Sequence, residues 1–220
     1  MRNVKVRPRP ASTVVLLDDK SRVYLTKRPN TMKFLGGYYV FPGGSVDKAD
    51  EIESNQFILN KPTASLDMSY YIAAARELFE EVGVLLATRE DGCAHMDEDK
   101  ANAYRQQLNN GELSFIEMLQ REKLFFNVEQ LQYFGTLVTP EGSPYRFDTS
   151  FFLTHLPEGQ SPDPDTYEIA DAFWVSPDEA LAAYSEGKLP MIAPTILSLQ
   201  SVIDYQKGNP LQLPKNPRLV

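Results

Sequence analysis

Apolar and polar residues alternate along several short segments of the chain, a pattern typical of half-buried β-strands. In the segment 145–155, every second residue from position 145 to position 153 is Tyr, Phe, Thr or Leu. Two other segments of this kind flank the turn-rich tetrapeptide DDKS at residues 18–21. The strands predicted in this way cover residues 11–17, 22–27, 131–138, 145–155 and 173–175.

Helices are predicted where apolar residues recur every three or four positions, or where capping residues come first. Ser176, Pro177 and the two acids that follow mark the start of one helix. The predicted helices cover residues 68–82, two short segments within 97–123 that separate at 109–111, a segment from 177 onward, and 192–206. Strands that alternate with helices predict an α/β or α+β domain.

The chain has 220 residues, of which 42% are hydrophobic, so it can bury a sizeable core. We expect one domain over residues 11–207. A basic arm of residues 1–10 precedes it, and a tail of residues 208–220 with three prolines follows it.

The helix predicted at 68–82 carries its charge on one side. At about 100° per residue, apolar residues such as Ile72 and Leu78 fall in one arc, while Glu77, Glu80 and Glu81 fall in an arc nearly opposite. Like charges at this spacing repel by a few tenths of a kcal/mol per pair, and Mg²⁺ or Mn²⁺ would relieve that repulsion. A solvated acidic face is the alternative.

A glycine follows this helix. Gly83 is placed where a helix ends with a residue of positive φ. We expect the next segment, 84–87, to start a strand.

The sequence Arg76-Glu-Leu-Phe-Glu-Glu-Val-Gly-Val84 resembles, position by position, the second half of the Nudix box, R-E-U-x-E-E-x-G-U with U apolar. The first half of that box is G-x5-E-x7. Here Gly44 is followed after five residues by Asp50, an aspartate in place of glutamate, and 25 residues rather than seven separate Asp50 from Arg76. This departure amounts to an 18-residue insertion, at about 51–68, and leaves open whether Asp50 still pairs with the helix.

An upstream segment is similar to the signature of coenzyme A diphosphatases, L-L-T-x-R-[SA]-x3-R-x3-G-x3-F-P-G-G. It reads Leu25-Thr-Lys-Arg28, Lys33, Gly37 and Phe41-Pro-Gly-Gly44 with the same spacing. It departs from the signature at Tyr24, Pro29 and Lys33. Thr139-Pro140 and the segment 146–152 further resemble the nucleoside-diphosphate-linked-moiety-19-like branch of the Nudix family.

The resemblance implies a Nudix fold, a mixed sheet between helices, with residues 97–123 as a helical elaboration. It also implies metal-dependent hydrolysis of a nucleoside diphosphate linked to another moiety. By family analogy Glu80 and Glu81 bind Mg²⁺ or Mn²⁺, and Glu77 is a ligand or the base that activates water. Arg76 would orient Glu77, and Gly43 would offer its carbonyl to the metal, although a tight turn explains this glycine equally.

Basic residues of the upstream signature are candidates for substrate binding. Lys27, Arg28 and Lys33 would meet the 3′-phosphate of coenzyme A, with Gly44 beside the substrate, while ordinary surface charge is the alternative. Some family members recruit a further carboxylate from a distant loop. The candidates for it are Glu141, Asp148 and Glu168.

The most specific function implied is hydrolysis of coenzyme A or acyl-CoA to 3′,5′-ADP and (acyl-)phosphopantetheine. A diphosphatase for ADP-ribose, NADH or nucleotide sugars is the nearest alternative. A non-catalytic Nudix-like binding or regulatory module is the other, although such modules can dispense with ligand glutamates that this chain has.

The formal net charge is −8, and it is the sum of a +7 segment at residues 1–33 and a more acidic remainder. The acidic total argues against a nucleic-acid partner, which would require a basic face. No apolar run approaches the roughly 18 residues of a membrane span, so no membrane partner is expected. With one cysteine, Cys93, the chain suits a reducing compartment, and we expect it in the cytoplasm. Whether it forms a homodimer is left open.

Overall fold

The structure is a computed structural model that describes residues 6–52, 55–60, 65–90, 92 and 96–214. Half of the expected basic arm (1–5), parts of the insertion (53–54 and 61–64), Cys93 and the last six residues (215–220) lie outside the described residues.

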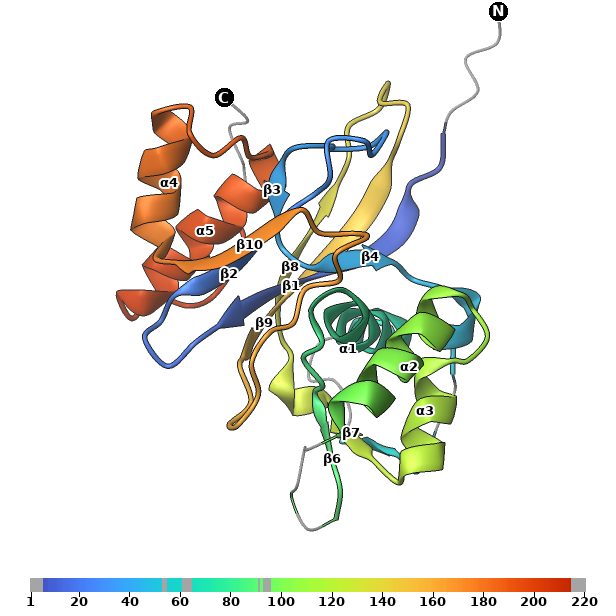
Figure 1. The fold of residues 1–220 in the computed structure, drawn as a ribbon. Coiled ribbons are helices and arrows are strands. Elements are labelled where there is room, and N and C mark those ends of the chain that lie inside the picture. The colour runs from blue at the N-terminus through green and yellow to red at the C-terminus, as the bar shows by residue number, and fades with distance from the viewer. Residues whose placement is uncertain (1–5, 53–54, 61–64, 91, 93–95, 215–220) are drawn as a thin grey trace, which may run out of the picture.

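A seven-stranded mixed sheet forms the centre of the molecule (Figure 1). Its strands are β1 (Arg9–Leu17), β2 (Val23–Lys27), β3 (Tyr39–Val40), β4 (Gly43–Ser45), β8 (Gln132–Val138), β9 (Phe147–His155) and β10 (Asp171–Val175). The order is β10-β2-β1-β9-β8, with β3 paired to β2 and β4 paired to β1. β1 and β9 run parallel along their whole lengths, with Arg9 opposite Phe147 and Leu17 opposite His155.

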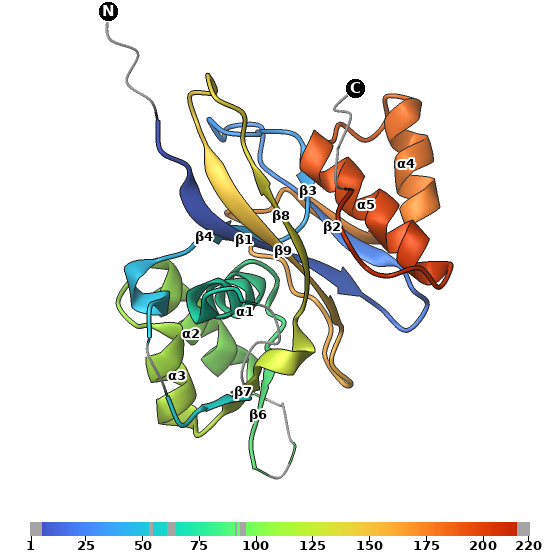
Figure 2. The ribbon, with the colours of Figure 1, turned by 180° about the vertical axis from the view of Figure 1, so that it is seen from behind.

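Helices cover both faces of this sheet. Helix α1 (Met68–Val82) lies on one face, and α4 (Pro177–Ser185) and α5 (Ala193–Gln206) lie on the other (Figures 1 and 2). Side chains of β1 alternate between the two sides, as the period of two in a strand requires. Val14 and Leu16 join the core around α1, whereas Val15 and Leu17 join the core around α5. The sheet is therefore buried from both sides.

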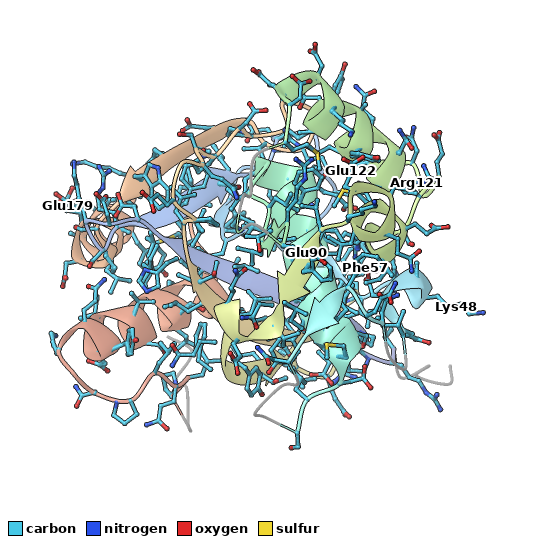
Figure 3. The ribbon with its side chains drawn as sticks, turned by 90° about the horizontal axis from the view of Figure 1, so that it is seen from below. Lys48, Phe57, Glu90, Arg121, Glu122 and Glu179 are labelled. Atoms are coloured by element: carbon cyan, nitrogen blue, oxygen red, sulfur yellow. The ribbon has the colours of Figure 1, made fainter. Side chains whose placement is uncertain are left out.

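A second unit, which we call the insertion lobe, packs beside α1. It contains a three-stranded sheet and two helices: β5 (Ile58–Leu59), β6 (Ala87–Thr88), β7 (Phe125–Asn127), α2 (Glu98–Asn109) and α3 (Phe115–Glu122). The insertion in the box supplies β5, which pairs in parallel with β7, and the rings of Phe57 and Phe125 lie 5.3 Å apart. Phe57 and Glu122 mark this lobe in Figure 3, on the side opposite Glu179 of α4.

Short one-turn 3₁₀ helices connect the two units. One spans Lys48–Asp50 just before the insertion, and the other spans Val128–Gln130 just before β8. The predicted α/β class, a mixed sheet between helices, is confirmed, and so are the two short helices in 97–123.

The expectation of a strand starting at residue 84 is wrong. Val84, Leu85 and Leu86 are buried but extended without strand pairing, and β6 begins only at Ala87. The reason is that the side chain of Gln160 makes the backbone hydrogen bonds that a neighbouring strand would otherwise make. The amide group of Gln160 accepts from the Leu85 N–H and donates to the Leu85 carbonyl, both at 2.8 Å.

The segment after α5, expected as a tail from residue 208, returns to the sheet. Leu213 is 8% exposed, and its N–H donates to the carbonyl of Phe134 in β8 at 2.8 Å. The next residue of β8, Gly135, has φ 149° and lies directly under the Leu213 side chain, where a Cβ would crowd it. In the described residues, no helix is both long and apolar enough to cross a bilayer.

Candidate active site

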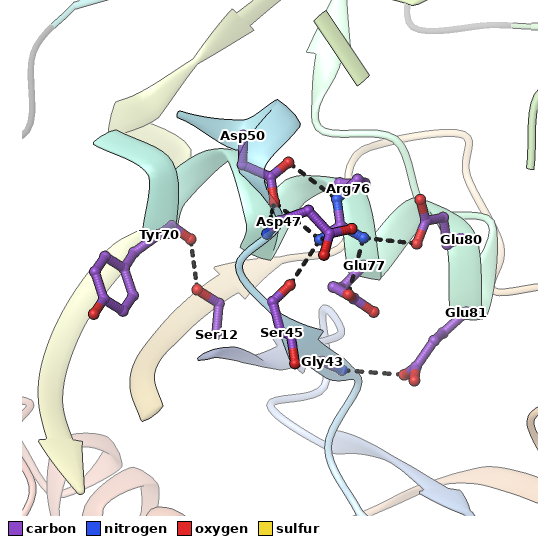
Figure 4. A network of polar contacts seen from close by, with 10 residues as sticks. All are labelled: Ser12, Gly43, Ser45, Asp47, Asp50, Tyr70, Arg76, Glu77, Glu80 and Glu81. Carbon is purple, nitrogen blue, oxygen red and sulfur yellow. Dashed lines mark hydrogen bonds and ion pairs between the residues drawn. The ribbon is translucent and has the colours of Figure 1, made fainter. Parts of the chain in front are cut away.

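Helix α1 is fixed at its start and along its apolar side. Asp67 caps it by accepting from the Ser69 N–H at 2.9 Å. Ser12 of β1 donates its hydroxyl to the Tyr70 carbonyl at 2.7 Å, so the first turn is tied to the central sheet. Ile72 and Leu78 are fully buried against that sheet. The helix therefore presents its glutamates toward β4 and the turn that precedes it (Figure 4).

The guanidinium of Arg76 is the centre of the polar network (Figure 4). Arg76 is 6% exposed and donates to Glu77 and Glu80, each at 2.9 Å. It also donates to the Ser45 carbonyl of β4 at 2.8 Å. One buried cation thus holds two of the three glutamates of the box and the strand opposite.

Asp50 pairs with the same guanidinium in spite of the insertion. Its two carboxylate oxygens accept from Nε and Nη2 of Arg76, both at 3.0 Å, and the residue is 1% exposed. This fork-to-fork geometry is the strong form of an arginine–carboxylate pair. Asp50 and Arg76 therefore still pair across the two halves of the box. The insertion begins after Asp50 and ends at Asp67, the cap of α1.

Two glycines allow β4 to lie against the glutamates. The Gly43 N–H donates to Glu81 at 3.1 Å, and Gly43 itself has φ 154°. A Cβ on Gly44 would overlap the carboxylate of Glu77, and one on Gly43 would overlap the Ser12 carbonyl. Position 43 therefore requires glycine for close approach, whereas a side chain at position 44 would displace the Glu77 carboxylate. Gly44 lies directly beside Glu77 and also lines a cavity on the other side of β4 from the glutamates.

The three glutamates are buried, so the alternative of a solvated acidic face is wrong. Glu80 and Glu81 are each 6% exposed, and the side chain of Glu77 is 13% exposed. Burial raises the pKa of Glu77 to about 7, with Arg76 opposing the shift. Burial and the charge of Glu77 raise the pKa of Glu80 to about 8 and that of Glu81 well above its usual range.

The residues of this cluster fit a divalent cation. Oε1 of Glu80 is buried and has no hydrogen-bond partner among the described residues. Mutual repulsion of buried carboxylates is the condition that a cation relieves. In the described part of the chain, no group of three or more His, Cys, Asp or Glu side chains is arranged closely enough to hold a metal ion by itself. Mg²⁺ does not need one, because it keeps several waters and uses one or two carboxylates with substrate phosphates.

The structure separates the three candidates for a further carboxylate. Glu168 lies in the loop before β10, and this loop packs on the end of α1. The charge of Glu168 contributes to the raised pKa of both Glu77 and Glu81. Burial and Asp165 in turn raise the pKa of Glu168. Asp148 lies instead on β9, where its charge acts on Tyr70, and Glu141 is exposed in the loop between β8 and β9. Of the three, Glu168 is placed with the glutamates of the box.

A cavity of about 290 Å³ lies beside Gly43 and Gly44, on the side of the sheet covered by α5. Aromatic residues, with Leu35, Val40 and Ile192, dominate its lining, and Arg28 enters it. The aromatic lining residues are Phe34, Phe41, Phe147 and Phe151. The charge of Arg28 also lowers the pKa of Glu81 and Glu168, so this base lines the cavity and acts on the carboxylates.

The three bases of the upstream signature are in different surroundings. Arg28 is half-buried at the cavity and donates from Nε to the Phe34 carbonyl at 3.3 Å. The ammonium of Lys27 lies over the ring of Tyr39, 5.4 Å from its centre, and Lys33 is exposed. Arg28 is thus the base that the structure brings to the site.

One buried base near the site was not identified from the sequence. Arg105 of α2 is 5% exposed and donates to the carbonyls of Glu80 and Glu81. In the sequence it is one base in a polar helix, and nothing in the local pattern distinguishes it from a surface charge.

A mixed sheet between helices, with a glutamate-bearing helix packed on a glycine turn, defines the Nudix hydrolase class. The structure matches the crystal structure of a NUDIX hydrolase from Alicyclobacillus acidocaldarius with a TM-score of 0.83 and 28% sequence identity, over 95% of this chain and 99% of that one. Residues 55–202 match the family described as the NUDT19 Nudix domain, and the chain belongs to this family of Nudix hydrolases.

Curated relatives agree with this assignment. A Caenorhabditis elegans protein whose name places it among the nudix hydrolases is 30% identical, over 86% of this chain and 58% of its own length. The Xenopus laevis protein named acyl-coenzyme A diphosphatase NUDT19 is 25% identical, over 86% of this chain and 61% of its own length. The chain therefore spans about three fifths of the length of these relatives.

Replacing Asp50 with Ala should lower the free energy of unfolding by about 3 kcal/mol, because it leaves the buried guanidinium of Arg76 without its bidentate partner. Asp47→Ala is the matched control, since its carboxylate lies 3.7 Å from the same guanidinium but is 65% exposed, and it should cost less than about 1 kcal/mol. Urea unfolding measures both. Equal losses for the two variants would show that Asp50 does not anchor the helix.

Mg²⁺ should stabilise the protein more at pH 8 than at pH 6. The pKa values of Glu77 and Glu80, about 7 and about 8, lie above the usual value of 4.5, so protons compete with a cation until the pH exceeds them. For the same reason the metal-free protein should lose stability as pH rises through this window, because the unfolded chain has already ionised. Thermal melting with and without Mg²⁺ measures both effects. A gain that is independent of pH would contradict this expectation.

Proposed function

We propose that this chain hydrolyses a nucleoside diphosphate linked to another moiety, with Mg²⁺ or Mn²⁺ as cofactor. The observation that carries the proposal is the buried cluster of Glu77, Glu80 and Glu81, in which Arg76 holds the first two and the Gly43 N–H holds the third. A surface that only contacts a partner has no need for three buried carboxylates with raised pKa values.

Glu80 and Glu81 would hold the metal, with the carbonyl of Gly43 as a further oxygen ligand. When bound, the metal would neutralise charge on the diphosphate and lower the pKa of coordinated water. Arg76 holds Glu77 and Glu80 by hydrogen bonds and keeps their carboxylates in place. Glu77, with a pKa of about 7, is suited to accept a proton from water near neutral pH.

Glu168 is a second candidate for the base. It approaches the cluster from the loop before β10, a segment separate from the box, and its pKa is also raised. Glu77 has its Oε1 committed to Arg76, whereas the base whose charge acts on Glu168 is Arg28. Comparison of Glu77→Gln with Glu168→Gln would distinguish a base from a ligand.

The most specific substrate we propose is coenzyme A or acyl-CoA, with 3′,5′-ADP and (acyl-)phosphopantetheine as products. The Xenopus laevis relative supports this choice, since it carries the name acyl-coenzyme A diphosphatase. The cavity adds a physical reason. Its exposed lining is mainly aromatic and aliphatic, and Arg28, whose charge acts on Glu81, also lines it and could meet a diphosphate. An apolar arm of the substrate would fit this cavity.

A diphosphatase for ADP-ribose, NADH or a nucleotide sugar is the second candidate. The different surroundings of the three upstream bases favour it. Lys33 is exposed and Lys27 lies over the ring of Tyr39, so Arg28 is the one of the three that lines the cavity. Such substrates have a diphosphate but no 3′-phosphate, so they need no site for one.

Purified protein should hydrolyse coenzyme A and acyl-CoA when Mg²⁺ or Mn²⁺ is present. A panel that adds dephospho-CoA, ADP-ribose and NADH, with products identified by mass spectrometry, tests the substrate class. Glu80→Gln should lower kcat/KM by at least about 100-fold, since it removes a proposed metal ligand. Wild-type protein that leaves every substrate intact, or a Glu80→Gln rate equal to wild type, would favour the binding module.

Arg28→Ala should raise KM for all diphosphate substrates, because Arg28 lies beside the carboxylates rather than at a separate phosphate subsite. Lys27→Ala and Lys33→Ala should change the ratio of kcat/KM for coenzyme A over dephospho-CoA if these two bases bind the 3′-phosphate. Loss of one charged hydrogen bond corresponds to about tenfold in that ratio. An unchanged ratio in both variants would count against recognition of the 3′-phosphate by this segment.

A further inference from the structure

The last turn of α1 has three carbonyls that lack the usual helical donor four residues later, those of residues 80–82. Each finds a donor from outside the helix. The Asp163 N–H donates to Val82. The remaining two carbonyls belong to Glu80 and Glu81, the residues proposed to hold the metal, and both accept from the side chain of Arg105.

Arg105 reaches this turn from α2 in the insertion lobe. Its Nε donates to the Glu80 carbonyl at 3.0 Å, and its Nη2 donates to the Glu81 carbonyl at 3.3 Å. Nη2 also donates to the Asp163 carbonyl at 2.8 Å, and Nη1 donates to the Asp163 carboxylate at 2.9 Å. The guanidinium therefore bridges two segments, the end of α1 and the loop before β10.

That loop is the one that carries Glu168. The Asp165 N–H also donates to the Glu81 carbonyl at 2.8 Å, and the Glu168 and Ile169 N–H groups donate to the Asp165 carbonyl. A chain of hydrogen bonds thus runs from Arg105 through the Glu81 carbonyl and Asp165 to the backbone of Glu168. It joins the backbone that holds Glu80 and Glu81 to the backbone that holds the approaching carboxylate.

The chemistry of arginine suits this position. A cation at the C-terminal end of a helix interacts favourably with the negative end of the helix dipole. The planar guanidinium also offers donors in fixed directions, so it sets distances among three backbone carbonyls, whereas a lysine ammonium is a single point on a flexible stem. Arg105 is 5% exposed, which limits its freedom to leave this arrangement.

We propose that Arg105 is a positioning residue for the metal site, supplied by the helical elaboration of the fold. It fixes the spacing between the turn that carries Glu80 and Glu81 and the loop that carries Glu168. This inference rests on the proposed metal site, but it assigns a role to a residue outside the box and gives the insertion lobe a function in the reaction.

The test compares Arg105→Ala with Leu108→Ala, a variant of the same helix. Leu108 is 6% exposed in the core around α1, so its truncation weakens the docking of α2 without touching the carbonyls of Glu80 and Glu81. Apparent Mg²⁺ affinity is measured by isothermal titration calorimetry with Mg²⁺, which requires no substrate. Arg105→Ala should need about 10-fold or more Mg²⁺ for half-saturation, whereas Leu108→Ala should melt earlier but keep the wild-type midpoint.

Arg105→Lys is the second variant and serves if Arg105→Ala does not fold. It keeps the charge but cannot reach Glu80, Glu81 and Asp163 together, so its midpoint should shift several-fold at a melting temperature near wild type. Midpoints of the foldable Arg105 variants equal to that of Leu108→Ala would overturn the inference. A wild-type protein with no Mg²⁺ response at all would instead overturn the metal site itself, and the inference with it.

Discussion

The ion pair between Arg76 and Asp50 is the constraint on which the rest of the site depends. A buried cation is tolerated only when it is paired and hydrogen-bonded, and Asp50 satisfies it with both carboxylate oxygens. With that pair in place, the remaining donors of Arg76 are free to hold Glu77, Glu80 and the Ser45 carbonyl. The same guanidinium offsets only part of the negative charge around it. The excess keeps the carboxylate pKa values high and leaves the cluster suited to a divalent cation.

Helix α1 is held at two points by polar contacts from outside its own sequence. Asp50 acts near its middle from the segment before the insertion, and Arg105 acts at its C-terminal turn from the helix after it. Between them the apolar side of the helix is fixed by close packing on the sheet. Packing sets the depth of the helix, whereas the two charged contacts set its rotation and the direction of its last turn, and the glutamates depend on both.

Local pattern was enough to predict helix α1 with its three glutamates, because a helical period of 3.6 and the position of Gly83 are properties of adjacent residues. The strands β8 and β9 were predictable for the same reason. The pair between Asp50 and Arg76 was not, since 25 residues separate them and only tertiary structure decides whether they meet. The position of Arg105 and the absence of strand pairing at residues 84–86 could not be predicted for the same reason. In each case a single distant side chain, that of Arg105 or Gln160, satisfies backbone groups that local patterns cannot assign.

The insertion inside the box is fixed at both of its ends, at Asp50 by its pair with Arg76 and at Asp67 by its role as the cap of α1. The entropy of closing a loop between fixed ends grows only with the logarithm of its length, about 0.6 kcal/mol for each doubling. The spacing between the two halves of the box is therefore nearly neutral for the chemistry as long as both ends stay anchored. A motif defined by fixed spacing in sequence is, in this protein, a motif defined by two anchors in space, and the chain between them was free to contribute a strand to the insertion lobe.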